Sequence, residues 1–407
     1  MLLLYNCFIR LYYILIFFVS FFNKKAKLLL NGWLNNNFNT YNQSIWFHFA
    51  SLGEFEQGRP VLEKMRLAYP SYPIVVTFFS PSGYEVRKNT QLANAVYYLP
   101  LDTAKNAKEF IETINPVIAV FTKYEYWYHY FNELNKRSIP LYMVSAIFRP
   151  KQVFFKWYGA LHRKMLTLVT HLFVQDNESK LLLQNIGINH TTVSGDTRFD
   201  RVWQNAKNPA HLPLIEQFKN NKPVFIGGST WPEDEKLIAE LVPLHAEWKF
   251  IIAPHEITED KILALVSMLP QNEVIRFSEI KNMALPLGNF RVLIIDNIGM
   301  LSSLYQYGEI AFIGGGFGAG IHNTLEAAAF GLPVIIGPKF QNFREARDII
   351  KMKLGFTVNN LTDLKPIADK LINDNAYRQK IGADIKTYVE DNTGATQAII
   401  NVIRLKG

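Results

Sequence analysis

Several features that define common protein classes are missing from this chain of 407 residues. It holds a single cysteine, Cys7, so an intramolecular disulfide is impossible and a cysteine-based zinc site is disfavoured. Its nine histidines form no HExxH pair, and the phosphate-loop patterns GxxxxGKS and GxxxxGKT are absent. A disulfide scaffold, a zinc protease and a P-loop nucleotide hydrolase are therefore poor candidates.

Acidic residues are absent from one whole region, residues 1–53, which carries Arg10, Lys24, Lys25 and Lys27. Over the full chain, 43 Lys and Arg against 35 Asp and Glu give a net charge of +8, which favours an anionic partner. No basic helix or aromatic–basic module stands out, so we expect no nucleic-acid partner. With 49% apolar and 19% charged residues, the chain has enough material for two hydrophobic cores, and we expect two domains.

Residues 1–22 are almost wholly apolar, and such a stretch is long enough to cross a bilayer as a helix. A cleaved signal peptide is the weakest interpretation, because no small-residue cleavage site follows Phe22. A buried core helix would need protein on all sides. We expect residues 1–34 to be a membrane anchor with a basic flank, either spanning the bilayer or lying in its interface with Arg10 reaching the headgroups. The lysines after the anchor favour a cytoplasmic body attracted to anionic lipid.

From residue 44 onward, short β-branched or aromatic runs alternate with segments of helical period, and the alternation restarts near residue 222. This predicts an α/β fold with two doubly wound, Rossmann-like domains and with ligand groups at the carboxyl ends of the strands, in the cleft between the domains. We expect an amino-terminal domain at 44–205, a second domain at 222–375 and carboxyl-terminal helices at 376–407. The expected strands are 45–49, 74–79, 95–98, 117–121, 141–144, 171–174, 191–193, 224–226, 250–253, 273–277, 292–295, 310–313 and 334–336.

Polar loops follow several of these strands, and their simplest explanation is structural. The capping-box spacing of a hydroxyl residue and a glutamate occurs three times, with one near match: Ser51–Glu54, Thr122–Glu125, Thr230–Glu233 and Asn323–Glu326. Taken alone, each glutamate is best explained as a residue that closes the start of a helix.

The loop at residues 314–320 has five glycines in seven positions, directly ahead of a predicted helix. Exposed amides such as those of Gly315 and Gly316, with a helix start behind them, form a ready anion site. No GxGxxG register fits, which disfavours a Rossmann dehydrogenase. His322 and Glu326 are four residues apart and share a face of the predicted helix. This pairing suits a nucleotide, with phosphate at the amides or His322 and ribose hydroxyls at Glu326.

Two carboxylates are candidates for acid–base chemistry. Glu54 lies beside Gly53 and is backed by the apolar Phe55, and such a carboxylate in a domain cleft acts as a general base when it is partly desolvated. Glu125 is a spare carboxylate on a neighbouring loop if the two preceding strands are adjacent. The aromatic residues around Glu125 are explained by core packing.

Five sequence blocks resemble, in order, the motifs of one enzyme family. They are WFHFASLGE at 46–54, SPSG at 80–83, LPLDT at 99–103, SGDTRFD at 194–200, and the 314–345 block with GPKFQNF at 337–343. By these blocks the chain resembles, from about residue 20 onward, the 3-deoxy-D-manno-octulosonic acid (Kdo) transferases of Gram-negative lipopolysaccharide synthesis.

The resemblance implies a GT-B glycosyltransferase on the cytoplasmic face of the inner membrane. Its donor would be CMP-Kdo and its acceptor a lipid A precursor, lipid IVA, with no metal and no further cofactor. Carried across, Glu54 would be the general base, Gly53 would lie close to the donor, and Glu125 matches the family's second acidic position. The remaining carried-over residues would bind CMP, two of them through their backbone: His322, Asn323, Glu326 and Asn342, with Gly299 and Met300.

Three positions depart from the family pattern. Pro254-His255-Glu256 stands where the family usually has Pro-Arg-His, so a phosphate-binding arginine is missing or supplied elsewhere. The family's Glu-Leu-Trp-Pro is Glu125-Tyr126-Trp127-Tyr128, and a lysine of the family is Arg198, a cation of different geometry.

Two other functions stay open on the sequence. One is another GT-B nucleotide-sugar enzyme, such as a UDP-sugar transferase or epimerase. The other is a non-catalytic, membrane-anchored nucleotide-sugar-binding protein, which the retention of Glu54 together with the 314–326 loop disfavours.

Overall fold

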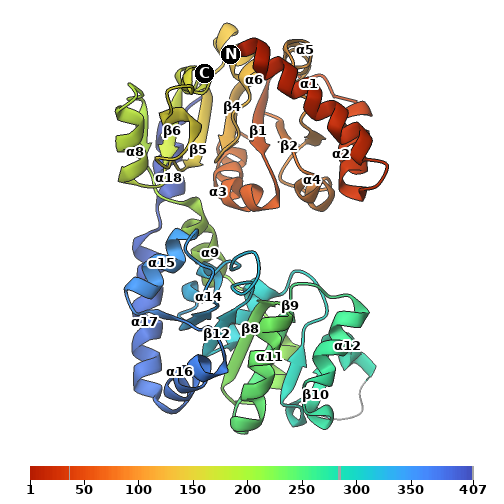
Figure 1. Cartoon of the computed structure of the whole chain (residues 1–407), viewed down its shortest axis with the longest axis vertical. Helices are drawn as coiled ribbons and strands as arrows, with labels where there is room; N and C mark the ends of the chain where they lie inside the picture. The colour runs from red at the N-terminus through yellow and green to blue at the C-terminus, as the bar shows by residue number, and fades with distance from the viewer. Residues whose placement is uncertain (36, 283–285, 406–407) are drawn as a thin grey trace. The chain divides into compact units, whose positions relative to one another are not determined.

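A computed structural model describes residues 1–35, 37–282 and 286–405. They form two compact units, each built on a seven-stranded sheet whose strand pairs are all parallel (Figure 1). The first unit comprises Met1–Arg201 together with the chain from Asn392 on, and the second comprises Val202–Asp391. The predicted fold class, α/β with two doubly wound units, is confirmed.

The sheet of the first unit has the strand order β3-β2-β1-β4-β5-β6-β7. Its strands are β1 Ser44–Phe49, β2 Ile74–Phe78, β3 Ala95–Tyr98, β4 Pro116–Thr122, β5 Leu141–Ala146, β6 His171–Val174 and β7 Thr191–Val193. Strands β1 and β4 are adjacent, with His48 opposite Phe121 in the register. Because parallel strands end at the same edge of a sheet, the loops that carry Glu54 and Glu125 are neighbours.

Helices cover both faces of this sheet. They are α1 Leu2–Val19, α2 Lys24–Leu34, α3 Leu52–Ala68, α4 Pro81–Arg87, α5 Ala104–Ile114, α6 Tyr128–Lys136, α7 Ala160–Thr167, α8 Asn177–Gln184, α9 Thr197–Lys207 and α18 Ala395–Val402, with the short 3-10 helix η1 Val153–Phe155. Alternate residues of β1 point to opposite faces: Trp46 packs with Phe110 of α5, and Phe47 packs in the cluster that contains Val61 of α3. The strands are therefore apolar on both faces.

The helix α18 returns from the far end of the chain to complete the first unit. Ile399 and Ile403 lie in the same buried cluster as Phe47. The carboxylate of Asp200 accepts hydrogen bonds from the amides of Gly394 at 2.6 Å and Thr396 at 2.7 Å, just ahead of and in the first turn of α18. The helices expected as one segment at 376–407 thus divide between the two units.

The sheet of the second unit has the order β10-β11-β9-β8-β12-β13-β14. Its strands are β8 Val224–Thr230, β9 Lys249–Pro254, β10 Val274–Arg276, β11 Val292–Ile294, β12 Ile310–Ile313, β13 Val334–Ile336 and β14 Gly355–Thr357. The strand β14 is an edge strand of three residues that the sequence did not predict. Central β8 lies between β9 and β12, so the loops after these three strands are adjacent.

The helices of the second unit follow the predicted alternation. They are α10 Pro213–Lys219, α11 Pro232–Leu241, α12 Glu259–Ser267, α13 Leu301–Leu304, α14 Leu325–Ala329, α15 Arg344–Lys351, α16 Leu361–Asn373 and α17 Asn375–Asp391, with 3-10 turns η2 Val242–Leu244, η3 Gln271–Glu273, η4 Phe277–Asn282, η5 Leu287–Asn289 and η6 Tyr305–Tyr307.

The segment between β5 and β6 does not form one continuous helix. The guanidinium of Arg163 donates to the carbonyl oxygens of Phe154 at 3.0 Å and Lys156 at 2.7 Å, which a continuous helix would use internally. The chain therefore turns after η1, and α7 begins only at Ala160.

Candidate functional site

Glu54 lies in the first turn of α3, immediately after β1. Its N-cap residue, Ser51, makes no side-chain bond to a helix amide, and instead its hydroxyl donates to the Glu54 carboxylate. The structural role proposed for this pair, a capping box, is therefore not the one that Ser51 performs. The Glu54 side chain is half-buried beside the exposed Gly53, so the carboxylate keeps contact with solvent.

Glu125 is held by two side chains from other parts of the first unit. Its Oε2 atom accepts from Nε1 of Trp127 at 2.9 Å and lies 3.1 Å from Nε2 of His48. His48 is fully buried in β1, whereas the Glu125 side chain is 13% exposed. No helix begins directly after Thr122, because α6 has Trp127 as its N-cap and starts only at Tyr128, so the capping-box explanation for Glu125 is wrong.

The orientation of the His48 ring is fixed by a further hydrogen bond. The indole of Trp46 donates to the hydroxyl oxygen of Thr77 at 2.9 Å, and this oxygen lies 2.8 Å from Nδ1 of His48. When the Thr77 hydroxyl donates to Nδ1, the imidazole carries its proton on Nε2 and donates it to Glu125. A chain of buried polar groups thus fixes the carboxylate of Glu125 at the sheet edge.

Cations accompany these carboxylates. Arg198 donates to Oδ2 of the buried Asp196 from Nε at 2.9 Å and from Nη2 at 2.8 Å. Gln57 donates to Oδ1 of the same carboxylate at 2.7 Å. Burial by itself raises the pKa of Asp196, but the charges of Arg198 and Lys123 outweigh it and leave the pKa below its ordinary value. The ionised Asp196 therefore anchors the guanidinium of Arg198 in one orientation.

Tyr124, next to Glu125 in sequence, lies among these charges. Burial raises the pKa of its phenol, Arg149 and Arg198 lower it, and Glu54 raises it. The charges of these three residues therefore all act on the phenol of Tyr124. Positive charges thus occur in this region of the first unit, in addition to the buried Phe55 that follows Glu54 in sequence.

The glycine loop of the second unit, residues 314–320, is packed tightly against neighbouring backbone. A side chain at Gly314 would meet the Ser229 carbonyl at 2.3 Å, and one at Gly316 would meet Gly337 at 2.6 Å. Gly315 has φ +92°, which L-residues with side chains rarely adopt. Gly320 has φ +135° and a side chain there would meet the ring of Phe343 at 2.9 Å, so close approach and turn geometry explain four of the five glycines.

Several amides of this loop are already used inside the unit. The Gly315 amide donates to Oδ2 of Asp234 at 2.9 Å, and the amides of Gly318 and Gly320 both donate to the Gly315 carbonyl. Asp234 also accepts from the amide of Trp231 at 2.8 Å, and burial raises the pKa of Asp234 to about 6. The Gly315 amide, expected to bind an anion, is thus engaged by a carboxylate of α11.

The start of α11 also differs from the expected capping box at Thr230 and Glu233. The N-cap is Trp231, one residue later, and the carboxylate that binds its amide is Asp234. Thr230 instead donates to Glu235 at 3.0 Å within the unit.

His322 belongs to a stack of three rings at the ends of β8, β9 and β12. Its ring lies 4.4 Å from that of His255, which lies 4.9 Å from the indole of Trp231. Nε1 of Trp231 donates to Nε2 of His322 at 3.1 Å, so the proton of a neutral His322 is on Nδ1. Burial and the neighbouring His255 lower the pKa of His322 to about 4. His322 is therefore a neutral hydrogen-bond donor at physiological pH, and not a cation.

His322 and Glu326 do not share a helix face. The helix α14 spans only Leu325–Ala329, because residues 314–323 are used in the loop that packs on β8 and β13. Asn323 links the two parts: its Nδ2 donates to Oε1 of Glu326 at 3.0 Å, and its Oδ1 accepts from the amide of Leu325 at 3.1 Å. His322, Asn323 and Glu326 still lie in one half-buried segment.

The other expected nucleotide contacts are on exposed loops. Gly299, with φ +99°, and Met300 precede α13 in the loop after β11. Asn342 is exposed between β13 and α15, and in the same loop the ring of Phe343 lies against Gly320. Asn342 is therefore the neighbour in sequence of Phe343, whose ring touches the glycine loop.

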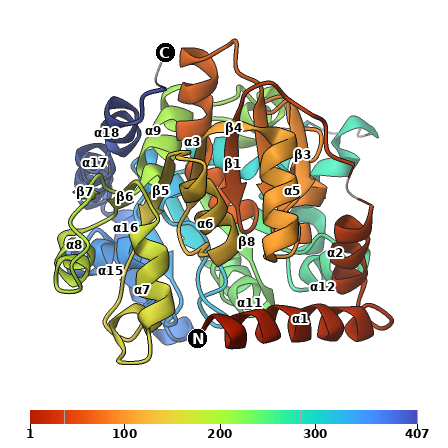
Figure 2. The ribbon, with the colours of Figure 1, turned by 90° about the horizontal axis from the view of Figure 1, so that it is seen from above.

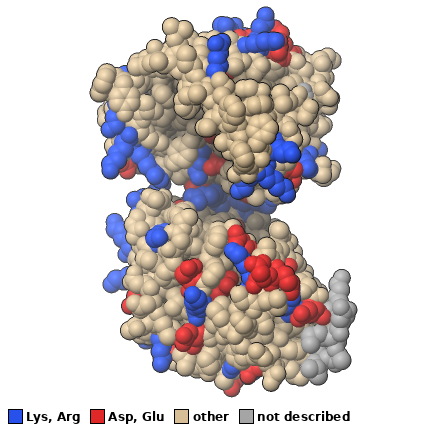
Figure 3. All heavy atoms as spheres, turned by 45° about the vertical axis from the view of Figure 1, so that its right-hand side comes forward, with Lys and Arg blue, Asp and Glu red and all other residues tan. Residues whose placement is uncertain are grey.

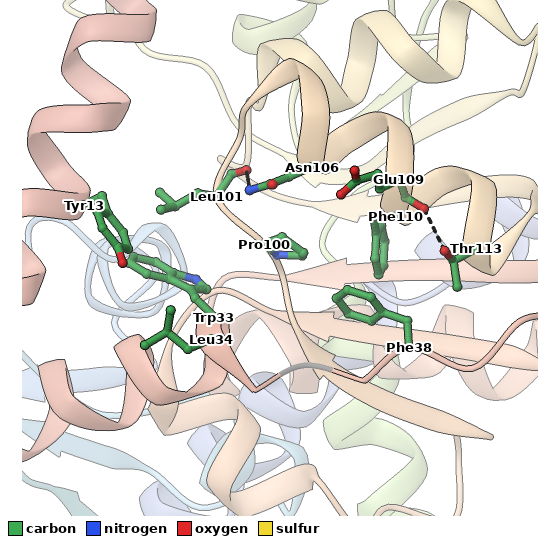
Figure 4. Close-up of a pocket in the computed structure, with 10 residues that line it drawn as sticks. All are labelled: Tyr13, Trp33, Leu34, Phe38, Pro100, Leu101, Asn106, Glu109, Phe110 and Thr113. Atoms are coloured by element: carbon green, nitrogen blue, oxygen red, sulfur yellow. Dashed lines mark hydrogen bonds between the residues drawn. The ribbon is translucent and has the colours of Figure 1, made fainter.

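Among residues 1–35, 37–282 and 286–405, no three His, Cys, Asp or Glu side chains are grouped so as to hold a metal ion. A cavity of about 370 Å³ lies in the first unit, lined by side chains of α1, α2, α5 and the loop after β3 (Figure 4). None of the expected site residues lines it, so this cavity is separate from the candidate catalytic residues.

Several residues of these two edges were missed from the sequence. They are His48, Thr77, Asp196, Trp231 and Asp234, whose contacts are described above. For His48 a signal existed, since one histidine interrupts an otherwise apolar strand. Asp234 contacts a residue 81 positions away, and no spacing pattern marks such a pair.

Residues 25–201 match the family model described as 3-deoxy-D-manno-octulosonic-acid transferase (kdotransferase). The 3-deoxy-D-manno-octulosonic acid transferase of Haemophilus influenzae is 27% identical over 373 residues, which cover 89% of this chain and 87% of that protein. Over most of its length the chain is similar to Kdo transferases, which are glycosyltransferases. Kdo transferases of Chlamydia trachomatis serovar A and Aquifex aeolicus are 24% and 25% identical, covering 83% and 79% of this chain and 80% and 84% of those proteins.

Solved structures support the fold of the chain. UDP-GlcNAc 2-epimerase from Neisseria meningitidis, bound to UDP-GlcNAc, matches with a TM-score of 0.61 and 14% identity, covering 88% of this chain and 98% of that one. The calicheamicin glycosyltransferase CalG4 matches with a TM-score of 0.54 and 13% identity, covering 89% and 98%. At such identity the likeness concerns the fold alone, which is that of GT-B enzymes.

Proposed function

We propose that this protein transfers Kdo from CMP-Kdo to a lipid A precursor, lipid IVA, at the cytoplasmic face of the inner membrane. The observation that carries this proposal is the placement of Glu54. In the unit that matches the Kdo transferase model, this carboxylate is held by Ser51 at a strand end, and its charge acts on the phenol of Tyr124 together with the charges of Arg149 and Arg198. A fixed, solvent-accessible carboxylate beside cations suits a base that works on a substrate with acidic groups.

In this proposal the second unit binds the CMP part of the donor. The Nδ1–H group of His322 donates to a phosphate oxygen, because Trp231 already occupies Nε2. Asn323 and Glu326 accept hydrogen bonds from the ribose hydroxyls. Gly299 and Met300 contact the nucleotide through their backbone groups. Gly315 and Gly316 shape the loop next to the nucleotide, and Asn342 is nearby.

In the first unit, Glu54 removes the proton from an acceptor sugar hydroxyl. The freed oxygen forms a bond to the anomeric carbon of Kdo while the bond from that carbon to the phosphate oxygen breaks, so that CMP leaves with the electron pair and the configuration inverts. The proton stays on Glu54 until it passes to solvent. Preorganised donors at the nucleotide stabilise the charge that develops on the leaving phosphate.

Glu125 has a positioning role in this scheme. Its carboxylate is fixed by His48 and Trp127 on the loop next to that of Glu54, and it orients the acceptor hydroxyl. Arg198 and Lys123 offset the negative charge of the sugar carboxylate and of the acceptor phosphates. No metal and no further cofactor takes part in the proposed transfer.

The proposal is tested by incubating the purified full chain with CMP-Kdo and lipid IVA and weighing the lipid product by mass spectrometry. We expect addition of Kdo, release of CMP and full activity in the presence of EDTA. A parallel panel of UDP-sugars serves as the control. Release of UDP with no CMP released from CMP-Kdo would assign the chain to a different nucleotide-sugar reaction.

A further inference from the structure

The helix α1 lies along the first unit over its length, beside α2, as Figures 1 and 2 both show. Its inward residues recur at helical spacing and are at least partly buried: Tyr5, Asn6, Ile9, Tyr12, Tyr13 and Ile16. Ile9 is almost fully buried, and the ring of Tyr12 stacks on Phe79 at 6.1 Å. One stripe of α1 is therefore packed against protein.

The first turns of this stripe make polar contacts with the body of the unit. The phenol of Tyr5 donates to the carboxylate of Asp102, which also accepts the amides of His129 and Tyr130 at 3.1 Å each. The amide oxygen of Asn6 lies 2.7 Å from Nε2 of His129. Because Asp102 is buried, removal of α1 would take a donor from a desolvated carboxylate.

The helix α2 fastens the other half of α1. Trp33 donates from Nε1 to the Leu99 carbonyl at 3.1 Å, and its ring contacts those of Tyr12 and Tyr13 at 6.0 and 6.3 Å. Figure 4 shows Tyr13 and Trp33 side by side at one end of the cavity. The turn between the helices is closed by Asn23, whose side chain accepts from two amides of α2. The two helices therefore form a hairpin that is fixed to the unit at both ends.

The outward stripe of α1 is apolar and exposed: Leu3, Leu4, Phe8, Leu11, Leu15 and Phe18. The Lys24, Lys25 and Lys27 side chains follow on α2 and are exposed as well. In Figure 3, which brings α1 and α2 forward, the first unit shows a broad area without charged side chains, and the charged side chains around its margin are mostly Lys and Arg with a few Asp and Glu. Such a surface, apolar with a basic border, fits an anionic lipid bilayer.

We infer that α1 does not cross the membrane but lies flat in its interface, docked on the first unit with its outward stripe in lipid. The inference rests on the proposed function only for the choice of membrane. It goes further by fixing the direction of the helix relative to the bilayer plane.

The length of α1 alone does not distinguish the two arrangements. With 18 residues and a mean hydropathy of 2.0 it satisfies the criteria for a spanning helix. A spanning α1, however, would place Arg10 near the bilayer midplane, where a charge is costly. It would also separate Tyr5 and Asn6 from Asp102 and His129. A flat α1 keeps these contacts and lets Arg10, which is exposed, reach the headgroups.

This arrangement has a consequence for the candidate site. The residues that α1 contacts follow β2, β3 and β4: Phe79, Asp102 and Tyr128. They lie at the same carboxyl edge of the sheet as Glu54 and Glu125. A flat α1 therefore holds the reactive edge at the height of the headgroups, where a lipid-linked sugar can reach Glu54 while its acyl chains stay in the leaflet.

The experiment measures the depth of α1 in vesicles of phosphatidylethanolamine and phosphatidylglycerol. In a Cys7→Ser background, single cysteines replace Leu4, Leu11 and Phe18, whose exposed fractions are similar at 70%, 63% and 61%. Each is labelled with an environment-sensitive fluorophore, and quenching is compared between lipids spin-labelled near the headgroup and near the acyl-chain end. We expect the same shallow ratio at all three positions, because α1 is about 27 Å long and would lie parallel to the surface.

Leu67→Cys on α3 is the matched control, since this leucine is 77% exposed but lies outside the hairpin. Its label should show no lipid quenching. A ratio that makes Leu11 deep and leaves Leu4 and Phe18 shallow would mean a spanning helix and would overturn the inference. Absence of quenching at all three positions, with dimers in sedimentation, would mean that a second copy covers the stripe. The readout uses no enzymatic activity, so a wrong assignment of donor or acceptor would not change it.

Discussion

The carboxyl edges of the two sheets differ, although the sheets share one architecture. At the edge of the first unit, Glu54 and Glu125 are held by hydroxyl, indole and imidazole groups among arginines. At the edge of the second unit, glycines bring backbone against backbone, and the imidazole of His322 is kept neutral in a ring stack. The first edge suits proton transfer, and the second suits holding a nucleotide without adding charge. In the proposed reaction the same fold would serve two kinds of chemistry, because loops and not strands carry the candidate residues.

The largest effect that the comparison predicts is at Glu54. Glu54→Gln should lower the transfer rate about 10³-fold, since the amide accepts no proton, while CMP affinity should stay unchanged because the nucleotide contacts belong to the other unit. Rates of Kdo transfer and CMP titration calorimetry measure the two quantities. Glu125→Gln is the matched variant and should lose less. If Glu54→Gln turns over normally and Glu125→Gln does not, the base is Glu125.

The second prediction concerns the second edge alone. Gly316→Ala should destabilise the second unit by about 1–3 kcal/mol and weaken CMP binding, because the added carbon would lie 2.6 Å from Gly337. Gly318→Ala is the control, since its nearest neighbour, the Gly315 carbonyl, would be 3.7 Å away. Denaturant unfolding and CMP titration compare them. Equal stability of the two variants would show that the loop relaxes around Gly316.

A third prediction tests whether His48 orients Glu125. His48→Phe keeps a ring in the buried strand but removes the hydrogen bond to Glu125, so kcat should fall about tenfold, which corresponds to roughly 1.4 kcal/mol. KM for the donor should not change. His48→Gln, which restores a donor, should recover part of the rate. Thermal unfolding of both variants shows whether the loss comes from the fold, and an unchanged kcat in His48→Phe would remove His48 from the scheme.

The smallest expected effect concerns pH: the contribution of His322 to CMP affinity should not depend on pH in the neutral range. With the pKa of His322 at about 4, its side chain stays neutral between pH 8 and pH 5. The ratio of CMP affinities of the protein and its His322→Gln variant should therefore be constant over that range, and this ratio cancels the titration of CMP itself. A ratio that rises as pH falls through 6.5 would mean that His322 binds phosphate as a cation.

Stability gives the same group a second readout. The folded pKa of His322 lies below the unfolded value of 6.5, so the unfolded chain binds the proton first. The contribution of neutral His322 to the free energy of unfolding is therefore complete above pH 6.5 and is lost as pH falls towards 4. Denaturant unfolding of the second unit should show this loss, and the His322→Gln variant should lack this part of it.

Much of the fold follows from the sequence, because buried parallel strands have continuous apolar runs and helices have apolar residues at a regular helical spacing. The placing of Glu54 in the first turn of a helix was within reach of such reasoning, whereas the adjacency of β1 and β4 was only a condition that the structure fulfils. The position of His322 relative to α14 was not within reach. His322 lies outside this helix because Gly314 and Gly316 must pack on distant backbone, and this packing uses up residues that local spacing assigns to a helix.

The partners of the site residues were also beyond the sequence. Asp234 contacts Gly315, and His48 contacts Glu125, over separations of 81 and 77 residues. Local patterns gave Glu125 a capping role, whereas tertiary contacts decide that it has none. The motifs therefore identify the candidate residues, whereas the hydrogen-bonding network that holds them is seen only in the three-dimensional structure.

The return of α18 to the first unit has a consequence for biosynthesis. On the ribosome, residues 1–201 emerge first, but the apolar surface that Ile399 and Ile403 cover and the carboxylate of Asp200 must wait until the whole second unit has been made. While the 190 residues of the second unit are translated, the core of the first unit therefore stays incomplete. Deletion of residues from 395 onward should expose that incomplete core to chaperones and proteases even though it leaves both candidate edges intact.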